Sequence, residues 1–152
     1  MLRQDISDAL KVAMKAKDRR ATSTLRLILA ALKDRDIAAR GNGDDSGISE
    51  DAVLDMLQKM IKQRHDSIEQ YEKGDRPDLV AQEAEEIEII GRFLPKQMDD
   101  DEMALAIGAV IEELGAASIK DMGKTMGALK KSCAGRMDFA KAALMVKQRL
   151  GA

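Results

Sequence analysis

The sequence is poor in aromatic residues, cysteine and proline, and these shortages exclude several kinds of structure. Its 152 residues include two Phe, one Tyr, one Cys, two Pro and no Trp. A single cysteine excludes an internal disulfide and is typical of a reducing compartment. No stretch approaches the roughly 20 apolar residues of a membrane span, and the amino terminus has no apolar signal core. We therefore expect a cytoplasmic protein that does not associate with membranes.

Apolar residues recur at the spacing of amphipathic helices, and no segment reads convincingly as a β-strand. Asp18 and Asp138 are placed to cap two of seven predicted helices. Leu94-Pro95 breaks the pattern, because proline disfavours a helical conformation in the residue before it. The sequence therefore predicts an all-α protein, with an N-terminal four-helix domain (1–94) joined at this hinge to a three-helix domain (99–152). Three predicted inner faces are Leu2, Ile6, Leu10 and Met14; Met103, Ile107, Val110 and Leu114; and Ile119, Met122, Met126, Leu129 and Cys133.

The formal net charge of -2 hides a strong segregation of charge along the chain. Residues 1–40 carry ten Lys/Arg against five Asp/Glu, and residues 116–152 carry eight against two. Residues 41–98 carry seven Lys/Arg against fourteen Asp/Glu, and residues 99–115 carry six acids and no base. Two basic ends therefore flank an acidic middle, and the nearly one-sided charge of 116–152 makes a nucleic-acid partner about as plausible as a merely solvated surface.

Helical periodicity places the basic residues on defined faces. At about 100° per residue, Lys120, Lys124 and Lys131 share one face of the sixth predicted helix. Gly127 lies between them and leaves a gap in the side-chain wall where a phosphate backbone could approach. Arg136 and Lys141 continue this predicted face, and a possible second basic stripe on the second helix consists of Arg19, Arg26, Lys33 and Arg40. Such stripes can neutralise phosphates without reading sequence, although most charged faces on amphipathic helices are merely solvated.

The residues usually found at catalytic and metal sites do not form a recognisable site in this sequence. His65 is the only histidine, and its neighbours Asp66 and Ser67 point elsewhere on a helix instead of converging on it. Cys133 falls on an apolar stripe, where a buried thiol is the simpler reading. The glutamates near Glu86 lack the Glu-x-x-His pairs of a di-metal bundle. We therefore predict no catalytic residue, metal or cofactor.

Three charged residues interrupt apolar stripes of the third and fourth predicted helices. Arg64 lies in the middle of one stripe, and Glu83 and Glu86 lie within the other. If the two helices form an antiparallel hairpin about Gly74, these residues come level. We interpret them as a structural ion pair that fixes the helix register.

Several motifs together resemble those of the GatB/YqeY family, which comprises small stand-alone bacterial proteins similar to the tail of the B subunit of aspartyl/glutamyl-tRNA amidotransferase. The motifs are Lys62-Gln63-Arg64, Phe93-Leu94-Pro95-Lys96-Gln97, Lys120-Asp121-Met122-Gly123-Lys124 with Met126-Gly127, and Gly135-Arg136 with Asp138. The resemblance covers nearly the whole chain. It departs at Met137, where a small residue is usual, and at Phe139, where Gly or Pro is common.

The resemblance implies a helical N-terminal part, a three-helix C-terminal part and contact of the latter with the body of tRNA. Carried over by motif, Lys124, Gly127 and Arg136 are the expected contacts. The resemblance also implies a relationship to a carbon–nitrogen ligase that uses glutamine as amido donor, but no amidase or phosphorylation site is visible. A tRNA-binding module is thus one hypothesis, a protein-interaction module that docks on a synthetase or amidotransferase is a second, and an unrecognised enzyme is a third.

Overall fold

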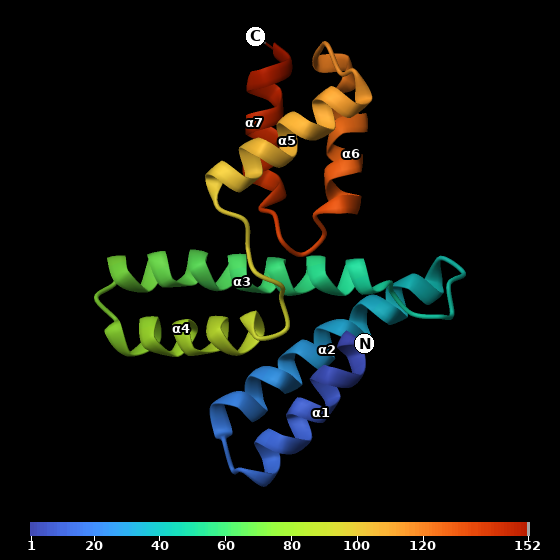
Figure 1. The fold of residues 1–152 in the computed structure, drawn as a ribbon. Helices are drawn as coiled ribbons and strands as arrows, with labels where there is room; N and C mark the ends of the chain where they lie inside the picture. Colours follow the sequence, from blue (N-terminus) through green and yellow to red (C-terminus); the bar gives the residue numbers. More distant parts are fainter. Residues whose placement is uncertain (152) are drawn as a thin grey trace. The chain divides into compact units, whose positions relative to one another are not determined.

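A computed structural model describes residues 1–151, and all regular secondary structure in that range is helical (Figure 1). The predicted all-α fold is therefore confirmed. The chain divides into two compact units, Met1–Pro95 and Lys96–Ala152. Each unit has its own cluster of buried apolar side chains.

The first unit consists of four helices, α1 (Leu2–Lys15), α2 (Arg19–Gly41), α3 (Glu50–Lys73) and α4 (Pro77–Gly91). Side-chain caps fix two of the helix starts. Asp18 accepts a hydrogen bond from the backbone N–H of Ala21 at 3.1 Å, and Ser49 accepts one from Ala52 at 3.2 Å. Figure 1 shows α1 beside α2 and α3 beside α4, and α2 also packs against α4.

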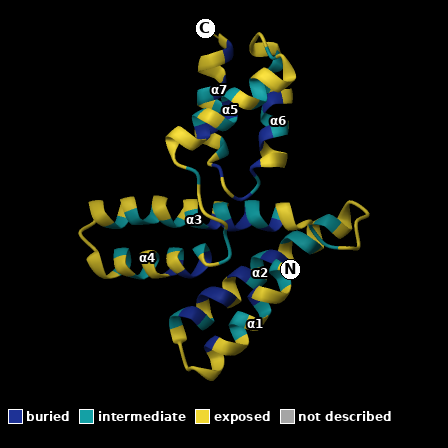
Figure 2. Ribbon diagram, in the orientation of Figure 1, coloured by how far each residue is buried: buried dark blue, intermediate teal, exposed yellow. Residues whose placement is uncertain are grey.

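The core of the first unit lies where these helices face one another (Figure 2). Its fully buried members include Ile6, Ile28, Leu57 and Ile90, one from each helix. Aliphatic residues and methionine fill this space because the chain has so few aromatic side chains. Thr24 is also fully buried within the unit.

The second unit contains α5 (Asp100–Leu114), the short 3₁₀ helix η1 (Ile119–Asp121), α6 (Met122–Ser132) and α7 (Phe139–Gly151). Asp99 and Glu102 form a capping box at the start of α5. The residues before α5 are tied to the loop between α6 and α7. Gln97 Nε2 donates to the Gly135 carbonyl at 2.6 Å, and the Met98 N–H donates to the Arg136 carbonyl at 2.8 Å.

Three predicted inner-face residues lie at the surface instead. Met14 and Ile119 are 49% and 47% exposed, and Leu114 is also exposed. Met14 is displaced because a four-residue repeat advances by 400° and drifts about 40° around the helix at each step. Ala13 is buried in its place. Ile119 belongs to η1, whose tighter turn ends before α6 begins, so it does not share the stripe of Leu129.

Candidate nucleic-acid interface

The start of α6 is fixed by a network of short-range hydrogen bonds around Asp121. The Asp121 carboxylate accepts the backbone N–H groups of Ala117 at 3.0 Å and Ser118 at 3.4 Å. These two bonds lower the pKa of the Asp121 carboxyl, and the nearby positive charge of Lys124 lowers it further. Thr125 Oγ1 donates to the Asp121 carbonyl at 2.9 Å. The turn that carries Lys120 is therefore held against the first turn of α6.

One side of α6 is buried and the opposite side consists of glycine and lysine. Leu129 and Thr125 are fully buried, whereas Gly123 and Gly127 are exposed. A Cβ atom built at either glycine would meet no atom within 4 Å outside its own helix. The two glycines are one helical turn apart and, at about 100° per residue, both point away from Leu129. They form an open strip of backbone, called here the glycine strip.

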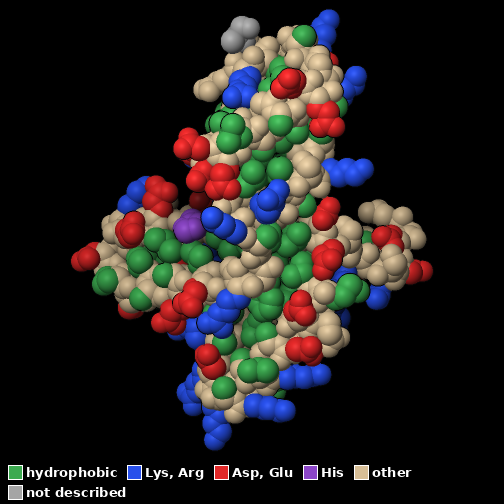
Figure 3. Space-filling model, viewed as in Figure 1, with side chains coloured by type: hydrophobic (Ala, Val, Ile, Leu, Met, Phe, Trp, Pro, Cys, Tyr) green, Lys and Arg blue, Asp and Glu red, His purple; other side chains and the backbone are tan. Residues whose placement is uncertain are grey.

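Lysines flank the glycine strip on both sides. Lys124 and Lys131 lie along one edge of it, Lys120 precedes it in η1, and all three are exposed. Lys130, which the sequence interpretation did not include, is exposed along the other edge. None of these four lysines forms an ion pair with any residue of the described range 1–151. Basic side chains project outward beside α6 in Figure 3.

Arg136 and Lys141 differ from these four lysines, which we call the α6 lysines. Arg136 is exposed, and its backbone carbonyl binds Met98. Lys141 Nζ donates a short hydrogen bond to Asp100 Oδ1, and this bond raises the pKa of the Lys141 ammonium group. The charge of Lys141 is therefore shared with α5. Sequence alone could not show this pairing, because the partners are 41 residues apart.

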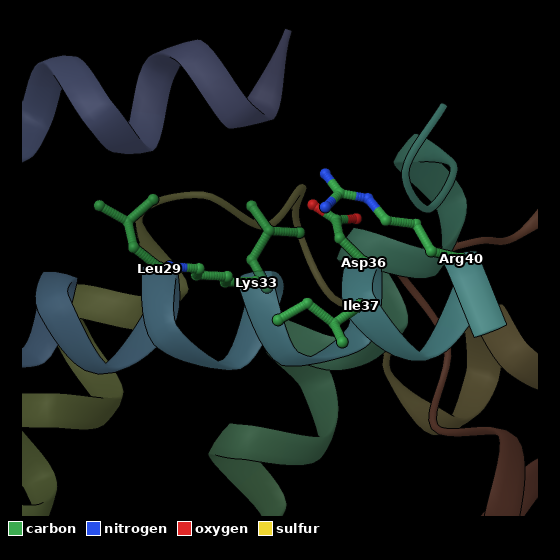
Figure 4. Close-up of a pocket in the computed structure, with 6 residues that line it drawn as sticks. Leu29, Lys33, Asp36, Ile37 and Arg40 are labelled. Carbon is green, nitrogen blue, oxygen red and sulfur yellow. The ribbon is translucent and has the colours of Figure 1, made fainter. Parts of the chain in front are cut away.

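The second basic stripe lies on the exposed side of α2. Arg19, Arg26, Lys33 and Arg40 are all exposed and form no ion pair among the described residues. The carboxyl-terminal half of the stripe borders a shallow groove along α2 (Figure 4). The groove is lined by Leu29, Leu32, Lys33, Asp36, Ile37 and Arg40.

Asp36 in this groove is engaged by α1 and by the loop before α3. Arg3 donates two hydrogen bonds to its carboxylate, at 2.7 and 2.8 Å, and the Ile48 N–H donates a third at 2.9 Å. The bonds from Arg3 and then that from Ile48 lower the pKa of Asp36 to about 2. Asp36 is therefore ionised at neutral pH, and its negative charge also interacts with the positive charge of Arg40 in the basic stripe.

An ion-pair network joins α2, α3 and α4. Arg64 Nε donates to Glu86 at 2.9 Å, and both side chains are nearly buried, at 13% and 10% exposed. Arg20 of α2 reaches Glu85 at 3.2 Å and Glu86 at 3.9 Å. Glu83 lies nearby, and burial together with the charge of Glu86 raises the pKa of its carboxyl. The network links three helices of the first unit, as a structural role requires.

The other candidate residues belong to different units. His65 is exposed on α3, and Cys133 is buried in the core of the second unit. Within residues 1–151 no three His, Cys, Asp or Glu side chains are grouped so that they could hold a metal ion. No helix in that range is both long and apolar enough to cross a membrane. The expected cytoplasmic location stays a prediction.

The class of protein that emerges is a two-unit, all-helical protein whose most developed surface features are basic helix faces. The sequence model of the family described as Yqey-like protein matches residues 3–150, so the chain belongs to the YqeY-like family. The structure places Met137 in the core of the second unit and Phe139 against that core. The two departures from the family pattern are thus accommodated by packing.

Curated relatives share part of this chain. A protein of Lachancea thermotolerans is 45% identical over 85 residues, 56% of this chain and 43% of the relative. Its Kluyveromyces lactis counterpart is 38% identical over 92 residues, 60% of this chain and 45% of the relative. Both are called altered inheritance of mitochondria protein 41, mitochondrial. The matched part is thus less than half the length of these relatives.

Proposed function

We propose that the second unit binds the phosphate backbone of a folded RNA, specifically tRNA, through the α6 lysines and the glycine strip between them. The proposal rests mainly on one observation. Four exposed lysines without ion pairs surround two helical glycines, and a Cβ atom built at either glycine would meet no neighbouring atom. Lysine side chains neutralise phosphates, and a helix surface without side chains lets the sugar–phosphate backbone come close. Arg136 extends the cationic surface beyond the end of α6.

A folded RNA suits this surface better than an unpaired strand. Readout of single-stranded bases uses aromatic side chains as stacking platforms. The α6 face has none, and Phe139, the one aromatic residue of the second unit, packs against its core. Recognition by shape and backbone is the mode that remains. The resemblance to the amidotransferase B-subunit tail makes tRNA the RNA of choice.

The proposal is tested by replacing Lys120, Lys124 and Lys131 with glutamine in the full chain. All three are exposed, so circular dichroism should show unchanged helicity. Binding of tRNA is measured from 50 to 300 mM salt for the wild type and the triple variant. In the variant, the magnitude of the slope of log affinity against log salt should be smaller by between two and three, at about 0.9 per duplex phosphate contact. Lys141→Gln is the matched control, and because Asp100 shares its charge the slope should change by less than one.

Two outcomes would overturn the proposal. One is wild-type protein without salt-sensitive affinity for tRNA, and the other is a triple variant that binds as the wild type does. The glycine strip would then favour the alternative, in which this protein is an adaptor. A helix of the partner, a synthetase or an amidotransferase, would pack closely against Gly123 and Gly127. Under that alternative Gly127→Leu abolishes capture of the partner protein, while the lysine variants retain it.

A further inference from the structure

The α1–α2 hairpin of the first unit carries a concentration of cations that form no ion pair with any described residue. Of the ten Lys/Arg in residues 1–40, Arg3, Arg20 and Arg35 form ion pairs. The other seven form none with any described residue, and all are exposed: Lys11, Lys15, Lys17, Arg19, Arg26, Lys33 and Arg40. Figure 3 shows basic side chains gathered around the turn that joins α1 to α2. We call Lys11, Lys15, Lys17 and Arg19 the hairpin cluster.

The acids of the hairpin are mostly occupied by other contacts. Asp18, between Lys17 and Arg19, uses its carboxylate to cap α2. Asp36 is held by Arg3 and the Ile48 N–H. Asp5 lies within 3.9 Å of the amino-terminal ammonium group. Residues 11–19 carry four Lys/Arg against one Asp, so the electrostatic potential around the turn is positive.

Lys17 occupies a backbone conformation that favours glycine. Its φ is 56°, in the left-handed region, at the turn that ends α1. The N–H of Lys17 bonds the Met14 carbonyl at 3.2 Å, and the N–H of Asp18 bonds the Ala13 carbonyl at 3.0 Å. A lysine there makes the turn less stable than a glycine would. The turn thus keeps a cation at its tip despite an unfavourable backbone conformation.

We propose that the hairpin cluster, continued along α2 by Arg26, Lys33 and Arg40, is a second, separate phosphate-binding surface for folded RNA. The inference rests on the proposed function for its polymer class, but it uses different residues on a different unit. From Arg19 to Arg40 the stripe runs 21 residues, about 30 Å along α2 at 1.5 Å per residue. A linear array of that length matches an extended polyanion such as an RNA backbone.

An anionic membrane fits the hairpin less well. Binding at a lipid surface needs one continuous apolar face beside the basic one. The exposed apolar residues of α1, Val12 and Met14, are about 160° apart around the helix at 100° per residue. On α2, Leu27 and Ile37 are about 80° apart, and no aromatic residue occurs in residues 1–40. The hairpin thus offers no aromatic anchor and, on α1, no continuous apolar face.

The test combines the two basic surfaces in one set of variants. The hairpin variant carries Lys11→Gln, Lys15→Gln, Lys17→Gln and Arg19→Gln, made both in the wild type and in the Lys120/Lys124/Lys131 triple variant. We expect the triple variant to keep salt-sensitive tRNA binding. The added hairpin changes should lower the magnitude of its salt slope by between three and four, at about 0.9 for each of four phosphate contacts. The control, Lys59→Gln with Lys73→Gln, removes lysines that pair with acids on α3 and should leave the slope nearly unchanged.

The two proposals fail in different ways. If the hairpin variant binds tRNA as the wild type does while the triple variant is weakened, the second surface is overturned and the proposed function stands. If only the hairpin variant is weakened, the proposed function fails and this inference stands. A third outcome would overturn the choice of RNA: the wild type binds phosphatidylserine vesicles, the hairpin variant does not, and the two proteins bind tRNA equally well.

Lys17→Gly separates charge from folding. It relieves the left-handed backbone and removes one cation, so the thermal midpoint of the first unit should rise while tRNA affinity at 50 mM salt falls severalfold. The matched control is Asp75→Gly, since Asp75 is the other non-glycine residue described with positive φ, at 55°. It should raise the midpoint without weakening RNA binding. If the tRNA affinity of Lys17→Gly is unchanged, Lys17 does not belong to the RNA-binding surface.

Discussion

Thr24 on α2 allows a sharp test of the packing of the first unit. It is fully buried, and its Oγ1 is the one buried side-chain polar atom within residues 1–151 that has no hydrogen-bond partner. The usual acceptor for a helical threonine is the carbonyl four residues earlier, here that of Arg20. Ser23 Oγ already donates to that carbonyl at 3.1 Å. Thr24→Val keeps the shape of the side chain and replaces the unpartnered hydroxyl by a methyl group.

The expected gain follows from the cost of the buried hydroxyl. Burying such a group without a hydrogen bond costs about 1 to 3 kcal/mol in protein mutational data. Threonine and valine have similar helix propensities, so the backbone contributes little to the difference. We expect Thr24→Val to raise the free energy of unfolding of the first unit by about 1 to 2 kcal/mol. For a unit of this size each kcal/mol raises the thermal midpoint by about 4 to 8 °C.

Unfolding of the first unit can be followed by tyrosine fluorescence. Tyr71 on α3 is the only tyrosine and there is no tryptophan, so the signal reports this unit alone. Thr22→Val is the matched control on the same helix. Its hydroxyl donates to the Asp18 carbonyl at 2.7 Å, so this change should lower stability by up to about 1 kcal/mol. The reasoning is refuted if Thr24→Val lowers the midpoint. It is also refuted if Thr24→Val raises the midpoint equally in a Ser23→Gly background, where Ser23 no longer donates to the Arg20 carbonyl.

Two further predictions concern charged groups of the first unit. Arg64→Ala should lower the free energy of unfolding by about 2 to 4 kcal/mol, because Glu86 is left nearly buried with only a 3.9 Å contact to Arg20. Arg64→Met should cost no more than Arg64→Ala, and urea unfolding of both variants would show this. The pKa of Asp36 is about 2 in the folded state, below its ordinary value of 3.8, so its stabilising contribution is full above pH 4 and is lost as pH falls towards 2. The loss should be about 1 to 2 kcal/mol, since Arg3 is partly exposed, and Asp36→Asn should remove this part of the pH dependence.

The all-helical fold could be predicted from sequence because local signals agreed with one another. Asp18 accepts the hydrogen bond expected of a helix cap, and Ser118 with Asp121 forms the predicted capping box. Gly115 ends α5 in the left-handed conformation, as a glycine after a helix commonly does. Each of these features depends on residues within a few positions of one another. Sequence therefore contains all that is needed to recognise them.

Inner faces were harder to predict at helix ends. Leu114 is the last residue of α5 and Ile119 lies in the 3₁₀ turn, and both follow the apolar spacing yet are exposed. Spacing assumes that a helix continues with the same period and that another element covers it along its whole length. Where a helix ends or tightens, either assumption fails. Glu86 is the opposite case, because it is a polar residue that is nearly buried. Its burial is explained by its partner Arg64 on another helix.

The candidate surfaces depend on which charges are paired, and pairing is a property of the fold. Of the seven Lys/Arg in the acidic middle, residues 41–115, five form ion pairs; of the eighteen in the two basic ends, fourteen form none with a described residue. Lys141 looks equivalent to Lys124 in sequence, yet Lys141 forms an ion pair with Asp100, whereas Lys124 forms none with a described residue. An unpaired cation can neutralise a phosphate, and so release a counterion condensed on the nucleic acid, without first breaking an existing ion pair. Salt dependence should therefore follow the unpaired residues of the hairpin and of α6, and not the total number of basic residues in either unit.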